Sequence, residues 1–423
     1  MKPEIEQKIN HIWHPLTQHK TAGAPLEIER AKGVLLYDSE GREYIDAISS
    51  WYTAVYGHLN PYVLDKVQEG MMSLDQVVFT GFTHKPAQEL AEKLFSICPK
   101  SLKKMFFSDN GSTSVDTALK MALQYWYNKG LTKRKIIAFE GAFHGDTFGA
   151  MSASDLDVYN GPFKEFLLEV ERIPVPDDSN IEDVLNTLET YLSSQDVICF
   201  IYEPLVQGAA GMKMYKPEHL NRLLRLVHHH DSLCVADEVM TGFGKTGTNF
   251  ASDQVEEFPD IMCLSKALTC GLVPMGLTLS SQKVYDAFYD NEQIKGFFHG
   301  HTYSANPMAC NAAIAGIDLL NQDHIKRGRL DIQESHSSFV KELNGFDKVL
   351  NARSMGVILA FELKESMERY GSRRNTLYNF FMDRGVYLRP LGNTIYILPP
   401  YVISKRDLDS IYEAIRSLLR EDS

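Results

Sequence analysis

Short apolar runs alternate with helix-like patterns over residues 104–280, and this alternation constrains the fold more than any other feature of the chain. Between the first two runs, apolar residues recur at helical spacing from Val115 to Trp126. Such alternation is typical of α/β proteins, in which helices cover both faces of a mostly parallel sheet. We therefore predict buried strands at 105–107, 136–139, 197–202, 233–236, 261–264 and 275–279.

The two ends of the chain have a different pattern. Residues 26–50 contain two alternating runs around Ser39-Glu40-Gly41, which predicts a β-hairpin. The last hundred residues mix strand patterns with a final helix, on one face of which lie Leu408, Ile411, Ile415 and Leu418. We expect a small α+β domain formed from residues 1–55 and 321–423, and a large domain over residues 56–320.

Composition and charge exclude several classes of function. The 423 residues include 43 Lys and Arg against 55 Asp and Glu, and the net charge of −12 disfavours nucleic acid as a partner. The longest apolar run, 197–202, is far shorter than the ~20 residues that span a bilayer, so no membrane segment is expected. The first thirty residues lack an apolar signal segment, and the six cysteines form no CxxC pair. These features favour a cytoplasmic location.

Two residues that follow predicted strands are candidates for chemistry. Asp237 follows the run "SLCVA" and Lys266 follows "IMCLS", at the strand ends where open parallel sheets bind ligands. Pyridoxal 5′-phosphate (PLP) requires such a pair, since a lysine forms an imine with its aldehyde and a carboxylate keeps its ring nitrogen protonated. On spacing alone, an ordinary ion pair is the simpler interpretation.

Other candidates concern anions and metals. Residues 110–113 precede a predicted helix and suit a phosphate, although a plain capping turn explains them equally well. Arg389 lies between two apolar runs and suits a substrate carboxylate or a structural salt bridge. No apolar-periodic helix follows the GxGxxG match at 242–247, which disfavours a dinucleotide site. The consecutive histidines 228–230 point in different directions, so no metal site is predicted.

The whole pattern resembles a known family. "LCVADEVMTGFGKTG" followed by "PDIMCLSKALTCG" is similar to the signature of class III PLP-dependent aminotransferases, and the resemblance extends over residues 12–401. The segments "GAFHGDTFGAMS", "HGHTYSANPMAC" and "YLRPLGNTIYILPPY" resemble the branch that aminates 8-amino-7-oxononanoate in biotin synthesis, with S-adenosylmethionine as amino donor. The resemblance implies fold type I, with a seven-stranded, mostly parallel sheet in a large domain, a small domain from both chain ends, and a homodimer with shared active sites.

The resemblance also implies roles for individual residues. Lys266 would be the catalytic residue that joins PLP and moves a proton, and His301 and Thr302 would reach the phosphate from the neighbouring subunit. The implied cofactor-binding residues are Gly111, Ser112, Phe143, His144, Asp237, Lys266, His301 and Thr302. The implied substrate-binding residues are Trp51, Tyr52, Phe143, Asp146, Gly300 and Arg389.

Departures from the family pattern leave the amino donor open. Leu16 and Phe143 stand where an aromatic hydroxyl is common, and Lys245 stands where many members have arginine. We expect ping-pong transamination with S-adenosylmethionine, with lysine as an alternative donor or another ω-amino acid as an alternative substrate. Met240, where ornithine-type and 4-aminobutyrate-type members carry glutamine, weighs against those branches. A regulatory module without catalysis and a nucleotide-dependent oxidoreductase remain weaker alternatives.

Overall fold

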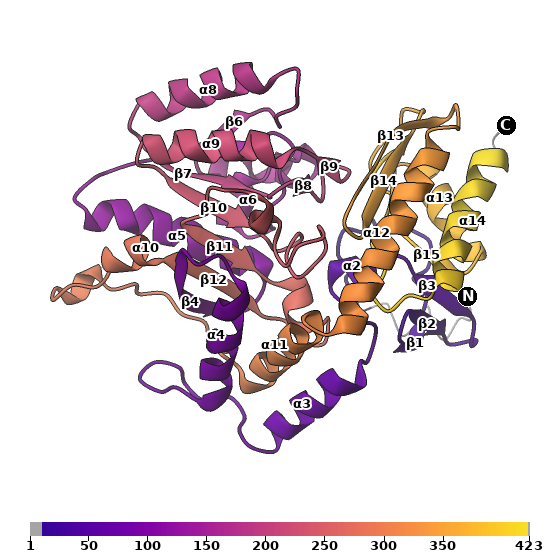
Figure 1. Cartoon of the computed structure of the whole chain (residues 1–423), viewed down its shortest axis with the longest axis horizontal. Helices are drawn as coiled ribbons and strands as arrows, with labels where there is room; N and C mark the ends of the chain where they lie inside the picture. Colours follow the sequence, from indigo (N-terminus) through magenta and orange to yellow (C-terminus); the bar gives the residue numbers. More distant parts are fainter. Residues whose placement is uncertain (1–10, 422–423) are drawn as a thin grey trace.

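A seven-stranded sheet forms the centre of the larger of two lobes (Figure 1). The computed structural model describes residues 11–421, so residues 1–10 of the predicted N-terminal segment lie outside the described part of the chain. In spatial order the strands are β4 (Leu102–Ser108), β12 (Gly276–Ser281), β11 (Ile261–Leu264), β10 (Leu233–Asp237), β7 (Val197–Tyr202), β5 (Lys135–Phe139) and β6 (Val170–Ile173).

The predicted mostly parallel sheet is confirmed. β12 runs antiparallel to both of its neighbours, while the pairs from β11 to β6 are parallel. All six predicted strands are present. β6 was missed because its sequence, VERI, has two charged residues and no apolar run.

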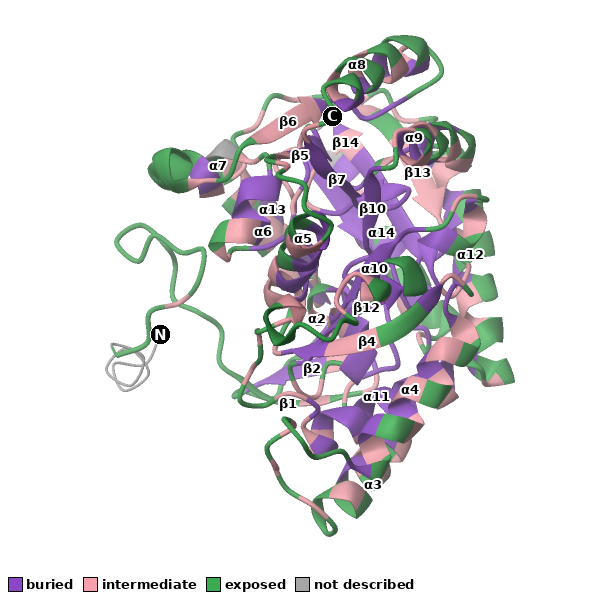
Figure 2. Ribbon diagram, turned by 90° about the vertical axis from the view of Figure 1, so that its left-hand side faces the viewer, coloured by how far each residue is buried: buried purple, intermediate pink, exposed green. Residues whose placement is uncertain are grey.

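Each face of this sheet packs into its own hydrophobic core. Along β5, Ile136 and Ala138 belong to the core beneath α5 (Gly111–Asn128), and Ile137 and Phe139 belong to the opposite core. That opposite core includes α8 (Ile181–Ser193), α9 (Pro217–His229), α3 (Pro61–Met71), α4 (Lys85–Ile97) and α11 (Pro307–Leu320). The strand period of two therefore directs alternate side chains to two helical layers, and the central strands are buried throughout (Figure 2).

The smaller lobe brings the two chain ends together. One sheet has the order β1 (Ile28–Lys32), β2 (Leu35–Asp38), β3 (Glu43–Asp46) and β15 (Val386–Tyr387). A second sheet joins β13 (Val349–Met355), β14 (Ile358–Leu363) and β16 (Thr394–Ile397). The helices of this lobe are α12 (Asp323–Leu343), α13 (Ser372–Asp383) and α14 (Lys405–Glu421). A small α+β unit from both ends is thus confirmed, and its boundaries along the chain stay a prediction.

Two local predictions in this lobe are also confirmed. β2 and β3 pair antiparallel, and Gly41 at their turn has a φ of 82°, a conformation that favours glycine. The four apolar residues of α14 that were expected to share a face are at most 4% exposed. Short elements complete the fold: α2 (Ser49–Tyr52), α6 (Phe148–Ala153), α7 (Asp157–Asn160), η1 (Gly161–Phe166), β8 (Val206–Gln207), β9 (Lys213–Met214), η2 (Ala251–Gln254), η3 (Lys266–Thr269), α10 (Gln282–Asp286) and η4 (Gln293–Lys295).

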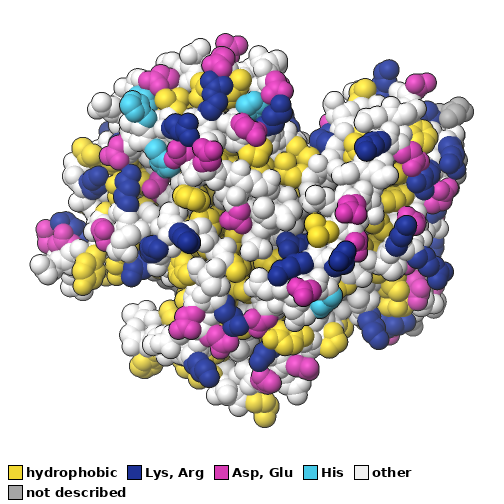
Figure 3. Space-filling model, in the orientation of Figure 1, with side chains coloured by type: hydrophobic (Ala, Val, Ile, Leu, Met, Phe, Trp, Pro, Cys, Tyr) yellow, Lys and Arg dark blue, Asp and Glu magenta, His cyan; other side chains and the backbone are white. Residues whose placement is uncertain are grey.

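The surface and the cysteines complete the description. On the face shown in Figure 3, basic and acidic side chains are interspersed over both lobes. All six cysteines are buried free thiols. Within residues 11–421, no helix is both long enough and apolar enough to cross a membrane.

Candidate active site

A cavity of about 540 Å³ is lined by the ends of β10 and β11 and by residues of the smaller lobe. Ten of the thirteen predicted site residues line it: Trp51, Tyr52, Gly111, Ser112, Phe143, His144, Asp146, Asp237, Lys266 and Arg389. These residues come from segments more than 300 positions apart in the chain. The fold therefore gathers most of the predicted site in one place.

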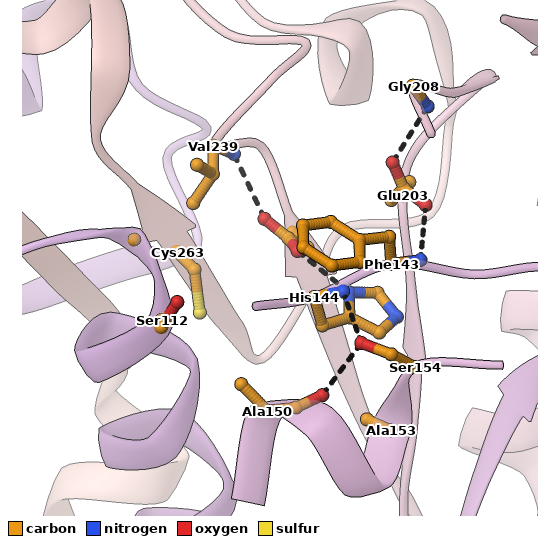
Figure 4. Close-up of polar contacts among 12 residues, drawn as sticks. Ser112, Phe143, His144, Ala150, Ala153, Ser154, Glu203, Gly208, Val239 and Cys263 are labelled. Atoms are coloured by element: carbon orange, nitrogen blue, oxygen red, sulfur yellow. Dashed lines mark hydrogen bonds and ion pairs between the residues drawn. The ribbon is translucent and has the colours of Figure 1, made fainter. Parts of the chain in front are cut away.

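Asp237 ends β10 and is held by hydrogen bonds rather than by Lys266. Its Oδ2 lies 2.7 Å from Nδ1 of His144, and its Oδ1 accepts the amide of Val239 (Figure 4). The His144 amide donates to Oγ of Ser154, and both side chains of the pair are buried. No Asp237–Lys266 ion pair forms, so the simpler interpretation of their spacing is wrong. A carboxylate fixed in this way can direct its charge toward a ligand.

Lys266 follows β11 and faces the cavity. Its backbone has a φ of 49°, a strained conformation for a side chain other than glycine and one that concentrates at functional sites. Burial lowers the pKa of its amine, against the opposing charges of Asp237 and Glu203. A lowered pKa increases the fraction of neutral amine, the form that acts as nucleophile and base.

Glu203 directly follows β7 and was not among the predicted site residues. Its Oε1 accepts the amide of Phe143 at 3.1 Å, and its Oε2 accepts the amide of Gly208 at 2.9 Å (Figure 4). The residue is 3% exposed, and burial raises the pKa of its carboxyl to about 7. Its place after the apolar run "VICFIY" was the available signal. Glu203 thus positions the backbone of Phe143 at the cavity.

The first turn of α5 forms another part of the wall. Asn110 caps the helix, since its Oδ1 accepts the amide of Thr113 at 3.0 Å. The capping turn and the cavity-lining turn are therefore the same structure. The amides of Gly111 and Ser112 have no partner within the helix, and such free amides favour an anion. A Cβ at Gly111 would lie 2.8 Å from Cγ1 of Val239, so any other residue there would force Val239 to shift.

The mouth of the cavity carries aromatic and cationic groups. Residues 49–52, the α2 turn, have φ values from 46° to 72°, and this left-handed turn carries Trp51 and Tyr52. The guanidinium carbon of Arg389 lies 5.3 Å from the Trp51 ring centroid. With every carboxylate whose side chain is described, Arg389 forms no ion pair, so the structural salt bridge considered for it is not observed there. Tyr159, Arg369, Tyr370, Arg374 and Tyr396 also line the cavity and had no sequence signal.

Three predicted residues do not line the cavity of this single chain. Nδ1 of His301 lies 2.9 Å from Oδ2 of Asp109, and the carbonyl of Thr302 accepts Nε2 of Gln76. Gly300 precedes them on the same segment. The resemblance assigns His301 and Thr302 to the site of a neighbouring subunit, and that assignment stays a prediction.

Of the residues that depart from the family pattern, some line the cavity and one does not. Leu16 and Phe143 line it. Lys245 does not, and its buried Nζ donates to the carbonyl of Gly242 at 2.9 Å. Burial, followed by the charge of Lys266, holds the pKa of Lys245 well below its usual range.

These groups fit PLP. A lysine amine, a carboxylate held by a histidine and a helix N-terminus face one space, and they match the aldehyde, ring nitrogen and phosphate of the cofactor. Nε2 of His144 is buried with no partner in the described structure, as expected where a ligand completes a site. A possible metal-ligand group elsewhere, His228, Cys234 and Asp260, is not part of the cavity lining.

Comparisons with known proteins agree with this geometry. The chain is 42% identical to an adenosylmethionine-8-amino-7-oxononanoate aminotransferase of Synechococcus elongatus, over 97% of this chain and 99% of that protein. The crystal structure of the enzyme of that name from Methanocaldococcus jannaschii is 30% identical, covers 98% of both chains and superposes with a TM-score of 0.92.

An amine transaminase from an uncultivated Pseudomonas species, solved in a PLP-bound form, is 25% identical, covers 97% of this chain and 98% of that one, and has a TM-score of 0.91. The family model for aminotransferase class III matches residues 17–419. This protein is thus an enzyme of the class III aminotransferase family.

Proposed function

We propose that this enzyme uses PLP to transfer an amino group from S-adenosylmethionine to 8-amino-7-oxononanoate, a step of biotin synthesis. The names of its relatives support this substrate pair. The observation that carries the proposal is the convergence of Lys266, the Asp237–His144 pair and the α5 N-terminus on one cavity. The reaction is ping-pong, so donor and keto acid occupy the cavity in turn.

The chain supplies positioning and proton transfer. When bound, PLP supplies an electron-withdrawing ring that makes the substrate hydrogen next to nitrogen acidic. Lys266, whose pKa is lowered by burial, binds the cofactor and moves this proton as base and then as acid. Asp237, oriented by His144, would keep a proton on the ring nitrogen of the bound cofactor. Gly111 and Ser112 would hold the phosphate through backbone amides, and Phe143, which lines the cavity, would pack against the cofactor ring.

Substrate recognition lies at the mouth. Arg389 binds the carboxylate of the keto acid, since its planar fork suits a carboxylate and no described carboxylate already occupies it. Trp51 and Tyr52 wall the apolar chain of the substrate, and Asp146 contacts the amino donor. Gly300 lies near the substrate of the neighbouring subunit, on the same segment as His301 and Thr302.

The experiment is single-turnover spectroscopy on the enzyme loaded with PLP. S-adenosylmethionine should bleach the absorption of the bound cofactor, and 8-amino-7-oxononanoate should restore it. Bleaching that is much faster with lysine would assign lysine as the donor instead. A protein that binds PLP but responds to 8-amino-7-oxononanoate no better than to other keto acids would contradict the proposed substrate.

We also propose a homodimer in which His301 and Thr302 complete the phosphate site of the neighbouring subunit. The exposed Tyr303 on this segment is consistent with an interface. Two inactive variants, Lys266→Ala and Thr302→Asp, should regain activity when mixed and refolded, because one site of each hybrid dimer is then intact. Hybrids that form and stay inactive would place Thr302 in its own subunit's site or in none.

A further inference from the structure

Two arginines besides Arg389 line the same cavity. Arg369 lies in the loop between β14 and α13, and Arg374 lies in the first turns of α13. Both side chains are partly buried. Among the side chains that the structure describes, neither forms an ion pair with a carboxylate, and this includes Asp146 in the cavity wall. Three guanidinium groups therefore face one space without a neutralising carboxylate among the described side chains.

Neutral groups hold these two arginines in place. Nη1 of Arg369 donates to the Ala209 carbonyl at 2.9 Å, and its guanidinium carbon lies 5.6 Å from the Tyr159 ring centroid. Nε of Arg374 donates to the Pro390 carbonyl at 3.4 Å, and its guanidinium carbon lies 5.1 Å from the Tyr370 ring. The hydroxyl oxygens of the two tyrosines are 2.6 Å apart. These contacts orient the arginines and leave their charges uncompensated.

Other arginines of the same lobe behave differently. Arg353 pairs with Glu362 at 3.0 Å, Arg373 with Glu365 at 3.1 Å, and Arg416 with Glu342 at 2.7 Å. The contrast is sharpest on α13, where Arg373 has a carboxylate partner and its neighbour Arg374 has none among the described residues. Burial and then the positive charge of Arg389 lower the pKa of Arg374. A bound anion would relieve both effects.

The arginine side chains also leave donors unused. Nε of Arg369 is buried with no hydrogen-bond partner in the described structure. A buried donor without a partner carries a desolvation penalty unless a ligand satisfies it. Guanidinium groups form bidentate, charge-assisted hydrogen bonds with carboxylates. The ligand that fits this wall is therefore an anion, and a carboxylate is the anionic group that amino acid and oxo acid substrates carry.

We propose that Arg369 and Arg374 form a second carboxylate-binding position in the cavity, so that the site takes dicarboxylates with one end on Arg389 and the other on this pair. The inference rests on the proposed role of Arg389 as the first carboxylate site. It adds α,ω-dicarboxylates, including dicarboxylic amino donors and oxo acids, to the ligands of the enzyme.

The experiment is calorimetric titration of the enzyme loaded with PLP. The probes are the unbranched α,ω-dicarboxylates from glutarate to azelate, each compared with the monocarboxylate of the same carbon number. We expect the dicarboxylate of matching length to bind about tenfold tighter or more, a preference that falls as salt increases. Equal affinity of both series at every length would overturn the proposal, and this comparison requires no variant.

Variants locate the second position. Arg369→Gln and Arg374→Gln should each reduce the preference for dicarboxylates while monocarboxylate binding remains, and Arg374→Lys should keep part of it. Arg373→Gln is the matched control, since Arg373 is the neighbour of Arg374 on α13 and is itself paired with Glu365, and it should keep the whole preference. A preference that survives both glutamine variants, or that disappears equally in the control, would overturn the proposal.

The same wild-type preparation separates this inference from the proposed function. Turnover of 8-amino-7-oxononanoate without any dicarboxylate preference would refute only the second carboxylate position. A dicarboxylate preference without that turnover would refute the proposed substrate instead and leave the position in place.

Discussion

The floor of the active-site cavity, formed by Asp237, His144, Glu203 and Lys266, and its mouth, formed by Trp51, Tyr52 and Arg389, differ in how their charged groups are partnered. On the floor, Asp237, His144 and Glu203 are each at most 4% exposed, and the two carboxylates accept hydrogen bonds from the chain. At the mouth, Trp51 is 43% exposed, and Arg389 has no carboxylate partner in the described chain. The protein itself completes most of the floor, whereas a ligand has to complete the mouth.

The difference follows from the cost of burying charge. Burying an unpaired charge inside a protein costs folding free energy on the order of several kcal/mol, so the charged groups on the floor require partners in the chain. A cation at the mouth stays in contact with water when no substrate is bound, so its charge costs less free energy there. The catalytic groups on the floor are therefore held in place before a ligand binds, and the arginine at the mouth remains free to bind a substrate carboxylate.

The largest expected effect comes from the floor. Lys266→Ala should lower turnover by at least ~10²–10⁴-fold, the range typical for loss of a general acid–base group, while the protein stays folded. The measurement is the steady-state rate with both substrates, and Lys283→Ala, an exposed lysine paired with Asp231, is the control. Turnover at the wild-type rate would exclude Lys266 from proton transfer.

A second effect on the floor is a pH dependence of stability. The Glu203 carboxyl has its pKa raised to about 7 by burial, so the folded state keeps a proton that the unfolded chain loses near pH 4.5. Its contribution to stability is complete below about pH 4.5 and is lost as the pH rises to about 7, with a total of up to ~3 kcal/mol.

Chemical denaturation of Glu203→Gln across this pH range tests the assignment. The free energy of unfolding should lose part of its decline with rising pH. The exposed Glu256→Gln should keep the wild-type slope. Identical slopes in all three proteins would mean that Glu203 is already ionised in this range.

At the mouth, Arg389→Gln should affect binding more than chemistry. We expect kcat/KM for 8-amino-7-oxononanoate to fall by roughly 10- to 100-fold, chiefly through KM, because one charge-assisted interaction is lost. Arg406→Gln, on the exposed side of α14, serves as the control. Unchanged saturation by the keto acid would remove Arg389 from substrate recognition.

The smallest expected effect concerns the N-terminal cap of α5. Asn110→Ala removes the cap bond to the Thr113 amide and should lower the free energy of unfolding by about 1 kcal/mol. Gln322→Ala changes a helix start that has no side-chain cap bond, and it should have little effect on stability. Equal losses in the two variants would show that the Asn110 cap contributes nothing specific.

The sequence alone determined the sheet class, the family and most of the floor. Periods of two and 3.6 residues are local patterns, so six of the seven central strands and the helix face of α14 could be predicted. Asp237, Lys266 and Gly111 could be located because each stands directly beside such an element, and the two-part motif identified their chemistry.

Only the tertiary structure decided which distant groups meet. The partner of Asp237 is His144, 93 positions away, and nothing local to either residue specifies that contact. Arg369 and Arg374 lie on a loop and a helix without a strand-end signal, and the packing of the smaller lobe brings them to the cavity. Local patterns encode secondary structure because neighbouring residues share it, whereas side-chain partners across the cavity depend on how whole layers pack.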